Sequence, residues 1–383
     1  MTNGIINVYK EAGYTSFDVV ACLRKIFNQK RIGHTGTLDP DAVGVLPICL
    51  GNATSVVELL TDRSKEYVAE FILGVSTDTQ DMTGSILEYN FDKASELDED
   101  GIAEAIMSFE GEIEQIPPMY SALKVNGQKL VDLARKGIEV ERKSRKVIIH
   151  GIEILENGRV SSNDIFSKIK NPEVLSDSVT NDGCLASDCN GKIGLHNSIR
   201  RYRIKVSCSK GTYIRTLIDD IGKKLGCGAA MSSLERTKSG EFTKEHAYTL
   251  DEIRRCKGDN VLDELVTSVD VMFEKNTAFI INEKGMKALQ NGNQLQSYML
   301  VPYEKVNVNF GVQQEMCDDA DVLKNCIDNF VKACGGMDDY DVTKYYDFEN
   351  GETIRVYDHT GEFRALYKYE KKRNFFSTVK MFL

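Results

Sequence analysis

One glycine- and proline-rich segment, GHTGTLDPDAVG at 33–44, constrains the fold more strongly than any other feature. No helix can run through it, because its three glycines are costly in a helix and its proline lacks the amide donor. The chain must therefore follow a fixed, irregular path, which presents His34, Asp39 and Asp41. An elaborate loop of this kind indicates a functional site, although a structural turn capped by an aspartate fits the same residues.

Regular elements are predicted on both sides of this segment. Thr15 and Asp18 form a capping-box pattern that opens a helix running to about residue 28. Residue patterns predict strands at 4–9, 66–73, 146–155 and 201–208, and helices at 98–109, 128–136, 211–226, 249–256 and 283–290. From about residue 277 the residue pattern changes. In this part, GETIRVYDHTGEF at 351–363 predicts two strands joined by a turn. We therefore expect a small β-rich domain at the C-terminus.

Length and composition are those of an ordinary globular protein. At 383 residues, 42% hydrophobic and 28% charged, the chain should form two or three folded domains and is neither disordered nor fibrous. No apolar run approaches the ~18 residues that cross a bilayer, and the N-terminus lacks the basic and apolar regions of a signal peptide. We expect a cytoplasmic protein that does not associate with membranes.

The ten cysteines are scattered and contain no CxxC pair, which predicts reduced thiols rather than disulfides. Cys184, Cys189 and His196 weakly resemble a set of metal ligands. Their spacing fits no common zinc pattern and a fourth ligand is missing, so we expect no metal site.

The net charge of −10 argues against a nucleic-acid partner, but the charge is unevenly distributed. Residues 301–350 hold 11 acidic and 4 basic side chains and supply most of the acidic excess. Basic patches at 142–146, 201–224 and 371–373 remain as candidates for RNA backbone contacts, although charge alone slightly favours solvated faces. Residues 156–200 are rich in Ser, Asn, Asp and Gly, which indicates a flexible insertion.

Two further groups of residues could carry chemistry. In SKGTYIRTL at 209–217, Tyr213 could stack on a base, and Arg215 could bind a phosphate or hold a carboxylate in bidentate geometry. The second group, KEY at 65–67, lies at the start of a predicted strand. Each tyrosine taken singly is consistent with simple packing. A phosphate-loop hydrolase is disfavoured, because no glycine-rich segment ends in Gly-Lys-Ser/Thr.

Five motifs occur in order along the chain: GHTGTLDPDAVGVLPICLG, KEY, STDTQDMTG, IPPMYSALKVNGQKL and CSKGTYIRTLIDDIG. Together they resemble the TruB family of tRNA pseudouridine synthases over most of residues 4–255. The resemblance implies an α/β (α+β) catalytic domain at 1–255, with the pseudouridine synthase fold built on a mixed, mostly antiparallel sheet. Within this domain, 119–145 would be an RNA-gripping insertion and 156–200 a flexible one. The C-terminal part is similar, more weakly, to the small β-rich PUA RNA-binding domain.

The domain boundaries that follow are a linker at 256–276 and a PUA-like domain at 277–383. Two features depart from the family pattern. Glu11 stands where the family usually has proline, which bears on the local turn at Lys10, and the compact members have no counterpart of 156–200.

The resemblance also implies the reaction, which is isomerisation of the T-loop uridine of tRNA, uridine 55, to pseudouridine. Carried over residue by residue, it makes Asp39 the catalytic carboxylate, paired with Arg215. The other residues that it places at the flipped nucleotide are His34, Tyr67, Tyr213 and Leu234. Tyr67 would pack against the base, and its phenol is a hypothetical carrier of the ring proton.

These residue types suit the reaction. The reaction involves no net oxidation or reduction, so no cofactor is expected. The carboxylate must be ionised, either to attack the anomeric carbon or to remove a neighbouring sugar proton, and both routes remain open. Desolvation raises the pKa of an aspartate, whereas a guanidinium partner lowers it. Extruding the nucleotide costs a few kcal/mol, and stacking on an aromatic ring returns about 1–3 kcal/mol.

The expected partner is the T-arm stem-loop of tRNA, with no obligatory protein partner and a monomeric enzyme. A role in tRNA folding would accompany catalysis. Two rival interpretations remain open: a noncatalytic RNA-binding protein that keeps the scaffold, and a synthase guided by a separate RNA. The run at 119–137 resembles bacterial members and favours a stand-alone enzyme.

Overall fold

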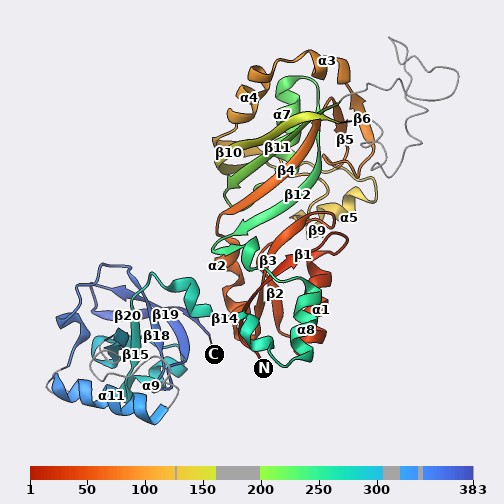
Figure 1. Cartoon of the computed structure of the whole chain (residues 1–383). Helices are drawn as coiled ribbons and strands as arrows, with labels where there is room; N and C mark the ends of the chain where they lie inside the picture. Colours follow the sequence, from red (N-terminus) through yellow and green to blue (C-terminus); the bar gives the residue numbers. More distant parts are fainter. Residues whose placement is uncertain (126, 161–198, 305–319, 335–339, 383) are drawn as a thin grey trace.

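The computed structural model describes residues 1–125, 127–160, 199–304, 320–334 and 340–382. They form two domains, each built around its own sheet (Figure 1). No helix in this part of the chain is long and apolar enough to cross a membrane. Cys184, Cys189, His196 and most of the 156–200 insertion lie outside the described residues. Among the residues that the structure describes, no group of three or more potential metal ligands occurs.

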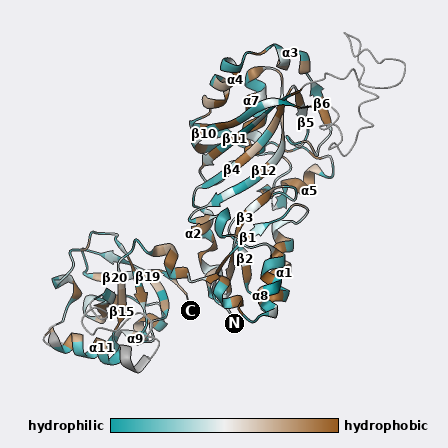
Figure 2. Ribbon diagram, viewed as in Figure 1, coloured by the Kyte–Doolittle hydropathy of each residue, from teal (hydrophilic) through white to brown (hydrophobic). Residues whose placement is uncertain are grey.

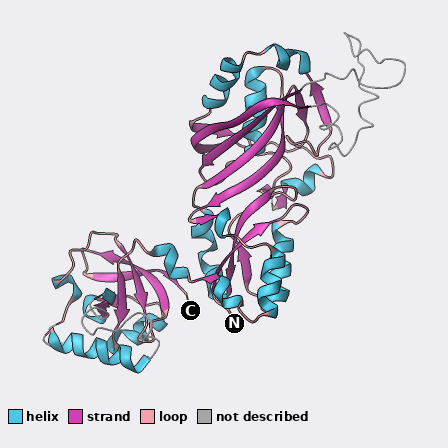
Figure 3. Ribbon diagram, viewed as in Figure 1, coloured by secondary structure: helices cyan, strands magenta, loops and turns pink. Residues whose placement is uncertain are grey.

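A ten-stranded sheet forms the first domain (Figure 3). Its strands are β1 (Gly4–Lys10), β2 (Ile32–His34), β3 (Val43–Leu50), β4 (Lys65–Leu73), β7 (Gly111–Gln115), β10 (Arg145–Val160), β11 (Ile199–Cys208), β12 (Ala229–Ser239), β13 (Phe242–Thr243) and β14 (Val266–Thr267). The order is β14-β1-β3-β12-β4-β11-β10-β7, with β2 paired to β3 and β13 to β12. Among the strand pairs that the structure describes in this sheet, only β3 with β12 is parallel, so the expected mixed, mostly antiparallel sheet is confirmed.

The helices of this domain are α1 (Ser16–Ile26), α2 (Val57–Thr61), α3 (Phe91–Glu96), α4 (Glu99–Met107), α5 (Leu130–Ala134), α7 (Ile214–Leu225) and α8 (Leu250–Gly258). The predicted capping box opens α1, because the amide of Asp18 donates to the Thr15 hydroxyl (3.1 Å) and the amide of Thr15 donates to the Asp18 carboxylate (2.9 Å). Two short hairpins complete the domain, β5 (Val75–Thr77) with β6 (Ile86–Tyr89) and β8 (Lys124–Val125) with β9 (Gln128–Lys129).

The central strand β12 was not predicted. Its sequence, AAMSSLERTKS, has no apolar alternation that would mark a strand, yet it lies between β3 and β4. The helix expected at 211–226 begins only at Ile214, because Gly211 has a φ of 79°, outside the helical region. It ends as predicted before Gly226, which adopts the left-handed conformation.

The second domain has a six-stranded sheet ordered β16-β20-β19-β18-β15-β17. Its strands are β15 (Ala278–Ile281), β16 (Leu295–Gln296), β17 (Leu300–Pro302), β18 (Thr353–Tyr357), β19 (Phe363–Glu370) and β20 (Phe375–Met381). The predicted strand, turn and strand at 351–363 is confirmed by β18 and the start of β19. The helices α9 (Glu283–Gln290) and α11 (Ala320–Ala333) accompany the sheet, and α11 carries both hydrophilic and hydrophobic residues (Figure 2).

One hydrophobic cluster runs across the boundary between the domains. Phe273 follows β14, which pairs with β1 at the edge of the first sheet, and its ring lies 6.2 Å from that of Phe363 and 6.3 Å from that of Phe382. The same cluster includes buried Ile5 and Cys49 of the first sheet. Because apolar side chains of both sheets pack into a single core, the two domains are joined by packing as well as by the chain.

Candidate active site

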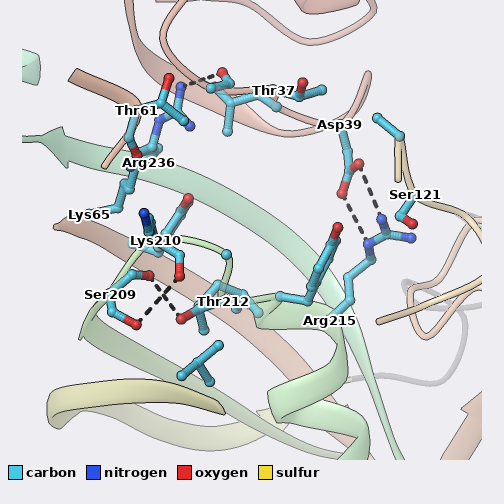
Figure 4. A pocket seen from close by; sticks show the side chains of 18 of the residues that line it. Thr37, Asp39, Thr61, Lys65, Ser121, Ser209, Lys210, Thr212, Arg215 and Arg236 are labelled. Carbon is cyan, nitrogen blue, oxygen red and sulfur yellow. Dashed lines mark hydrogen bonds and ion pairs between the residues drawn. The ribbon is translucent and has the colours of Figure 1, made fainter. Parts of the chain in front are cut away.

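A cavity of about 570 Å³ lies beside the 33–44 loop (Figure 4). Its walls come from this loop, the start of β4, the turn before α7 and strand β12. These elements are far apart in the sequence, and the sheet order β3-β12-β4 brings them together. Lys65, Lys210 and Arg236 lie across the cavity from Asp39 and Arg215 (Figure 4).

The predicted pair of Asp39 and Arg215 is present. The two carboxylate oxygens of Asp39 lie 3.0 Å from Nε and 3.2 Å from Nη2 of Arg215, which is bidentate geometry. The Arg215 side chain is only 6% exposed, whereas that of Asp39 is 40% exposed. The guanidinium also donates to the carbonyls of Thr79 (3.2 Å) and Tyr120 (2.9 Å). The buried guanidinium therefore fixes the carboxylate of Asp39, which stays accessible from the cavity.

A buried lysine anchors the Asp39 loop on its C-terminal side. Nζ of Lys10 donates to the carbonyls of Pro40 (3.0 Å), Tyr14 (2.6 Å) and Glu11 (3.1 Å), and the side chain is fully buried. Burial lowers the pKa of Lys10 to about 8. Glu11 takes part in this network only through its backbone carbonyl, so this contact does not depend on its side chain.

A buried arginine that sequence analysis missed contacts the chain on both sides of Asp39, at Gly36 and Val45. Arg236 on β12 is 1% exposed and donates from Nε to the carbonyl of Val45 (2.7 Å) and from Nη2 to that of Gly36 (3.3 Å). Burial raises the pKa of Tyr67, and Arg236 opposes this rise through its charge and a hydrogen bond. Arg236 thus links the tyrosine and the loop that carries Asp39. No signal in the unpredicted strand β12 singles it out.

The surroundings of Asp39 raise the pKa of its carboxyl above that of a free aspartate. Burial raises the pKa of Asp39, and the nearby carboxylate of Asp81 adds to the rise, while Arg215 and Lys10 oppose it. Burial is the largest of these effects, so the net direction is upward. The guanidinium limits the rise and thereby favours the ionised form.

Three other predicted residues line the same cavity. Tyr67 lies on β4 and is 9% exposed, Leu234 lies on β12 and is 8% exposed, and Tyr213 precedes the first residue of α7. Burial raises the pKa of Tyr213 as well as that of Tyr67, so both phenols are protonated at neutral pH. The cavity therefore combines one ionisable carboxyl with two aromatic rings.

His34 is placed differently from the other predicted residues. It lines an adjoining cavity of about 850 Å³, together with Phe17 and Asp41, and the two cavities share Asp39 and Leu234. Burial and the charge of Arg236 lower the pKa of His34, so its imidazole is neutral at pH 7. Asp39 thus lies where the two cavities meet, with His34 on one side only.

The 119–145 segment also contributes to the site. Its residues Ser121 and Ala122 line both cavities, and the Tyr120 carbonyl accepts a hydrogen bond from Arg215. Of the KEY motif, Lys65 is buried beside Tyr67 and donates to the carbonyls of Thr61 and Arg63 (2.6 Å). Burial lowers the pKa of Lys65 to about 8.

Comparison with known proteins identifies similar sequences over the whole chain. The model of the TruB family pseudouridylate synthase N-terminal domain matches residues 24–168, and that of the tRNA pseudouridylate synthase B C-terminal domain matches residues 215–274. The chain is 40% identical over 381 residues to tRNA pseudouridine synthase B of Lachnoclostridium phytofermentans, covering 100% of both chains. It is 44% identical over 299 residues to the protein of that name from Clostridium acetobutylicum, covering 78% of this chain and 87% of the other.

Solved structures of lower identity share the fold. A Cbf5-Nop10-Gar1 complex matches with a TM-score of 0.57 and 24% identity, covering 100% of this chain and 85% of that one. An H/ACA RNP bound to a substrate RNA containing 2'-deoxyuridine matches with a TM-score of 0.56 and 22% identity, covering 99% of this chain and 85% of that one.

Proposed function

The chain belongs to the TruB family of pseudouridylate synthases, and we propose that it isomerises the T-loop uridine of tRNA, uridine 55, with Asp39 as the catalytic carboxylate. The observation that carries this assignment is the bidentate Asp39–Arg215 pair at the wall of a cavity large enough for a nucleotide. The protein is an isomerase, because the reaction rearranges one nucleotide without gain or loss of atoms.

In the proposed mechanism, ionised Asp39 either attacks C1′ of the uridine or removes a proton from C2′, and the bond from N1 to C1′ breaks. The detached base turns within the cavity and C5 bonds to C1′, while the ester bond from Asp39 to C1′ breaks or Asp39 returns the proton to C2′. The C5 proton then leaves so that the ring regains its conjugation, and N1 takes up a proton. The reaction involves no net oxidation or reduction, so the chemistry itself requires no cofactor. Arg215 supports either route by holding the carboxylate in one orientation.

The aromatic and aliphatic walls suit an extruded base. Extrusion from the T-loop costs a few kcal/mol, and stacking of the base on Tyr67 returns about 1–3 kcal/mol. Tyr213 and Leu234 enclose the base further, and His34 contacts the nucleotide from the adjoining cavity. In this proposal the phenol of Tyr67 carries the ring proton during the final step.

The RNA grip is assigned to several parts of the chain. Residues 119–145 close on the T-arm, and the domain at 277–383 adds contacts as a PUA-like RNA-binding module. It is joined to the catalytic domain 1–255 through residues 256–276, whose strand β14 pairs with β1 of the first sheet. We propose a monomeric cytoplasmic enzyme that acts on tRNA without a guide RNA or protein partner and that also assists tRNA folding. Turnover of bare tRNA by the purified chain tests this against the RNA-guided alternative.

Replacing Asp39 with asparagine tests the catalytic assignment. D39N removes the charge with little change of shape, so we expect tRNA affinity within about threefold of wild type and turnover at least about 10³-fold lower. Tritium release from uridine-labelled tRNA measures turnover, and filter binding measures affinity. Asp220→Asn is the matched control, because Asp220 lies on α7 with Arg215 but lines neither cavity. Near-normal tritium release by D39N would refute the assignment, and normal binding without any turnover by the wild type would favour the noncatalytic alternative.

A further inference from the structure

A separate cavity lies between the two domains and shares no lining residue with the cavities at Asp39. This seam cavity has a volume of about 500 Å³. Lys30 and Arg31 line it from just before β2, Lys380 lines it from β20 of the second domain, and Glu58 is the single acidic residue in its wall. The hydroxyl-bearing residues Thr54 and Ser55 complete its polar surface.

The geometry of the seam cavity is held by contacts between the domains. Nδ2 of Asn52 donates to the carbonyl of Phe382 (2.9 Å), next to the strand that carries Lys380. The hydrophobic cluster around Phe273 lies across the same boundary. The basic groups of the two domains are therefore held close together, and like charges held this way repel unless an anion lies between them.

The three basic side chains are not neutralised by the protein. Nε of Arg31 donates to the Thr54 hydroxyl (2.8 Å), which orients the guanidinium. None of the three forms an ion pair with a carboxylate in the described ranges of the chain, whereas other surface cations do, such as Arg254 with Asp251 and Lys368 with Glu370. The three cations outnumber the single carboxylate of the cavity wall, Glu58, so the wall attracts a polyanion.

We propose that the seam cavity binds the phosphodiester backbone of the RNA substrate, outside the pocket for the target uridine; the proposal rests on the proposed function. Arginine, lysine and hydroxyl groups are common ligands of RNA phosphates. Gly33 lines the seam cavity and His34 lines the cavity at Asp39, and they are neighbours on β2. Since adjacent strand residues are only about 3.3 Å apart along the strand, the two sites lie close enough for one RNA to contact both.

Neutralising the seam cavity tests the proposal. In the full-length chain, K30Q, R31Q and K380Q are combined, and affinity for an unmodified tRNA transcript is measured by filter binding over a series of salt concentrations. We expect affinity about 10- to 100-fold lower at low salt and a slope of log affinity against log salt that is shallower by about 2, because up to three phosphate contacts are lost. The single-turnover rate at saturating tRNA should equal that of the wild type. The side chains replaced are at the surface, and thermal unfolding confirms that the fold is kept.

The matched control neutralises Arg254, Lys324 and Lys368, which changes the net charge equally but removes cations that pair with carboxylates. A loss of tRNA affinity confined to the seam variant supports the proposal. An unchanged affinity and slope overturns it, as does an equal loss in the control, which would show an effect of the overall charge. A slower single-turnover rate would also overturn it by placing these residues in the catalytic site. Wild-type turnover is measured in parallel, so failure of the proposed function is distinguishable from failure of the seam-cavity proposal.

Discussion

Replacing Arg215 with methionine removes the cation that opposes the burial of Asp39 while keeping an unbranched side chain of similar length. Breaking a buried ion pair by removing one partner costs about 3–5 kcal/mol. Because the Asp39 side chain is 40% exposed, solvent screening reduces this to about 2–3 kcal/mol. If this free energy disfavours the ionised carboxylate, which is the reacting form, turnover on the acidic limb of the pH profile decreases about 30- to 160-fold, and the loss becomes smaller as pH rises.

The pH dependence of R215M separates this mechanism from a general loss of structure. Burial already raises the pKa of Asp39, and without the guanidinium the pKa rises further. The reaction needs the ionised form, so the acidic limb of the rate profile shifts to higher pH and the variant recovers part of its rate as pH increases. Single-turnover rates at saturating tRNA, measured from mildly acidic to mildly alkaline pH, follow this shift.

Two variants serve as controls for R215M. R215K keeps the charge but loses the bidentate geometry, so we expect an intermediate loss of about 10-fold and a smaller shift of the acidic limb. R200M removes an arginine whose side chain is 8% exposed and pairs with Glu99 outside both cavities, so it should lower stability and keep the wild-type profile. A wild-type rate and an unshifted acidic limb in R215M would refute the proposed role of the pair.

Two further predictions concern Tyr67 and Lys10. Tyr67→Phe keeps the ring and removes the hydroxyl, so tRNA affinity should be unchanged while turnover falls about 10²-fold; full turnover would leave Tyr67 a packing role only. Burial lowers the pKa of Lys10 to about 8, so above that pH the native state releases a proton that the unfolded chain retains up to its ordinary value of 10.5. The unfolded state then binds more protons, which makes this contribution to stability increase with pH. In urea unfolding, the stability of wild type relative to Lys10→Met should rise by about 1 kcal/mol from pH 7 to pH 9, and a constant difference would contradict the burial of a charged Lys10.

Much of the local structure could be predicted from residues near one another in the sequence. The capping box at Thr15, the glycine that ends α7 and the strand, turn and strand after residue 351 are predicted from the sequence and are present in the structure. Each depends on backbone sterics and hydrogen bonds within a few residues. Strand β12 was missed because its stability comes from neighbours on both sides rather than from its own apolar pattern.

The candidate site divides in the same way. The sequence motifs by themselves determined which side chains are available, namely a carboxylate on a rigid loop, an arginine near a helix start and a tyrosine on a strand. Their assembly depended on tertiary structure, since Asp39 and Arg215 are 176 positions apart and meet only because of the order of the strands. The burial of Arg236 and the net rise in the pKa of Asp39 were likewise decided by packing. Desolvation depends on atoms that surround a group in space, and no local pattern in the chain contains that information.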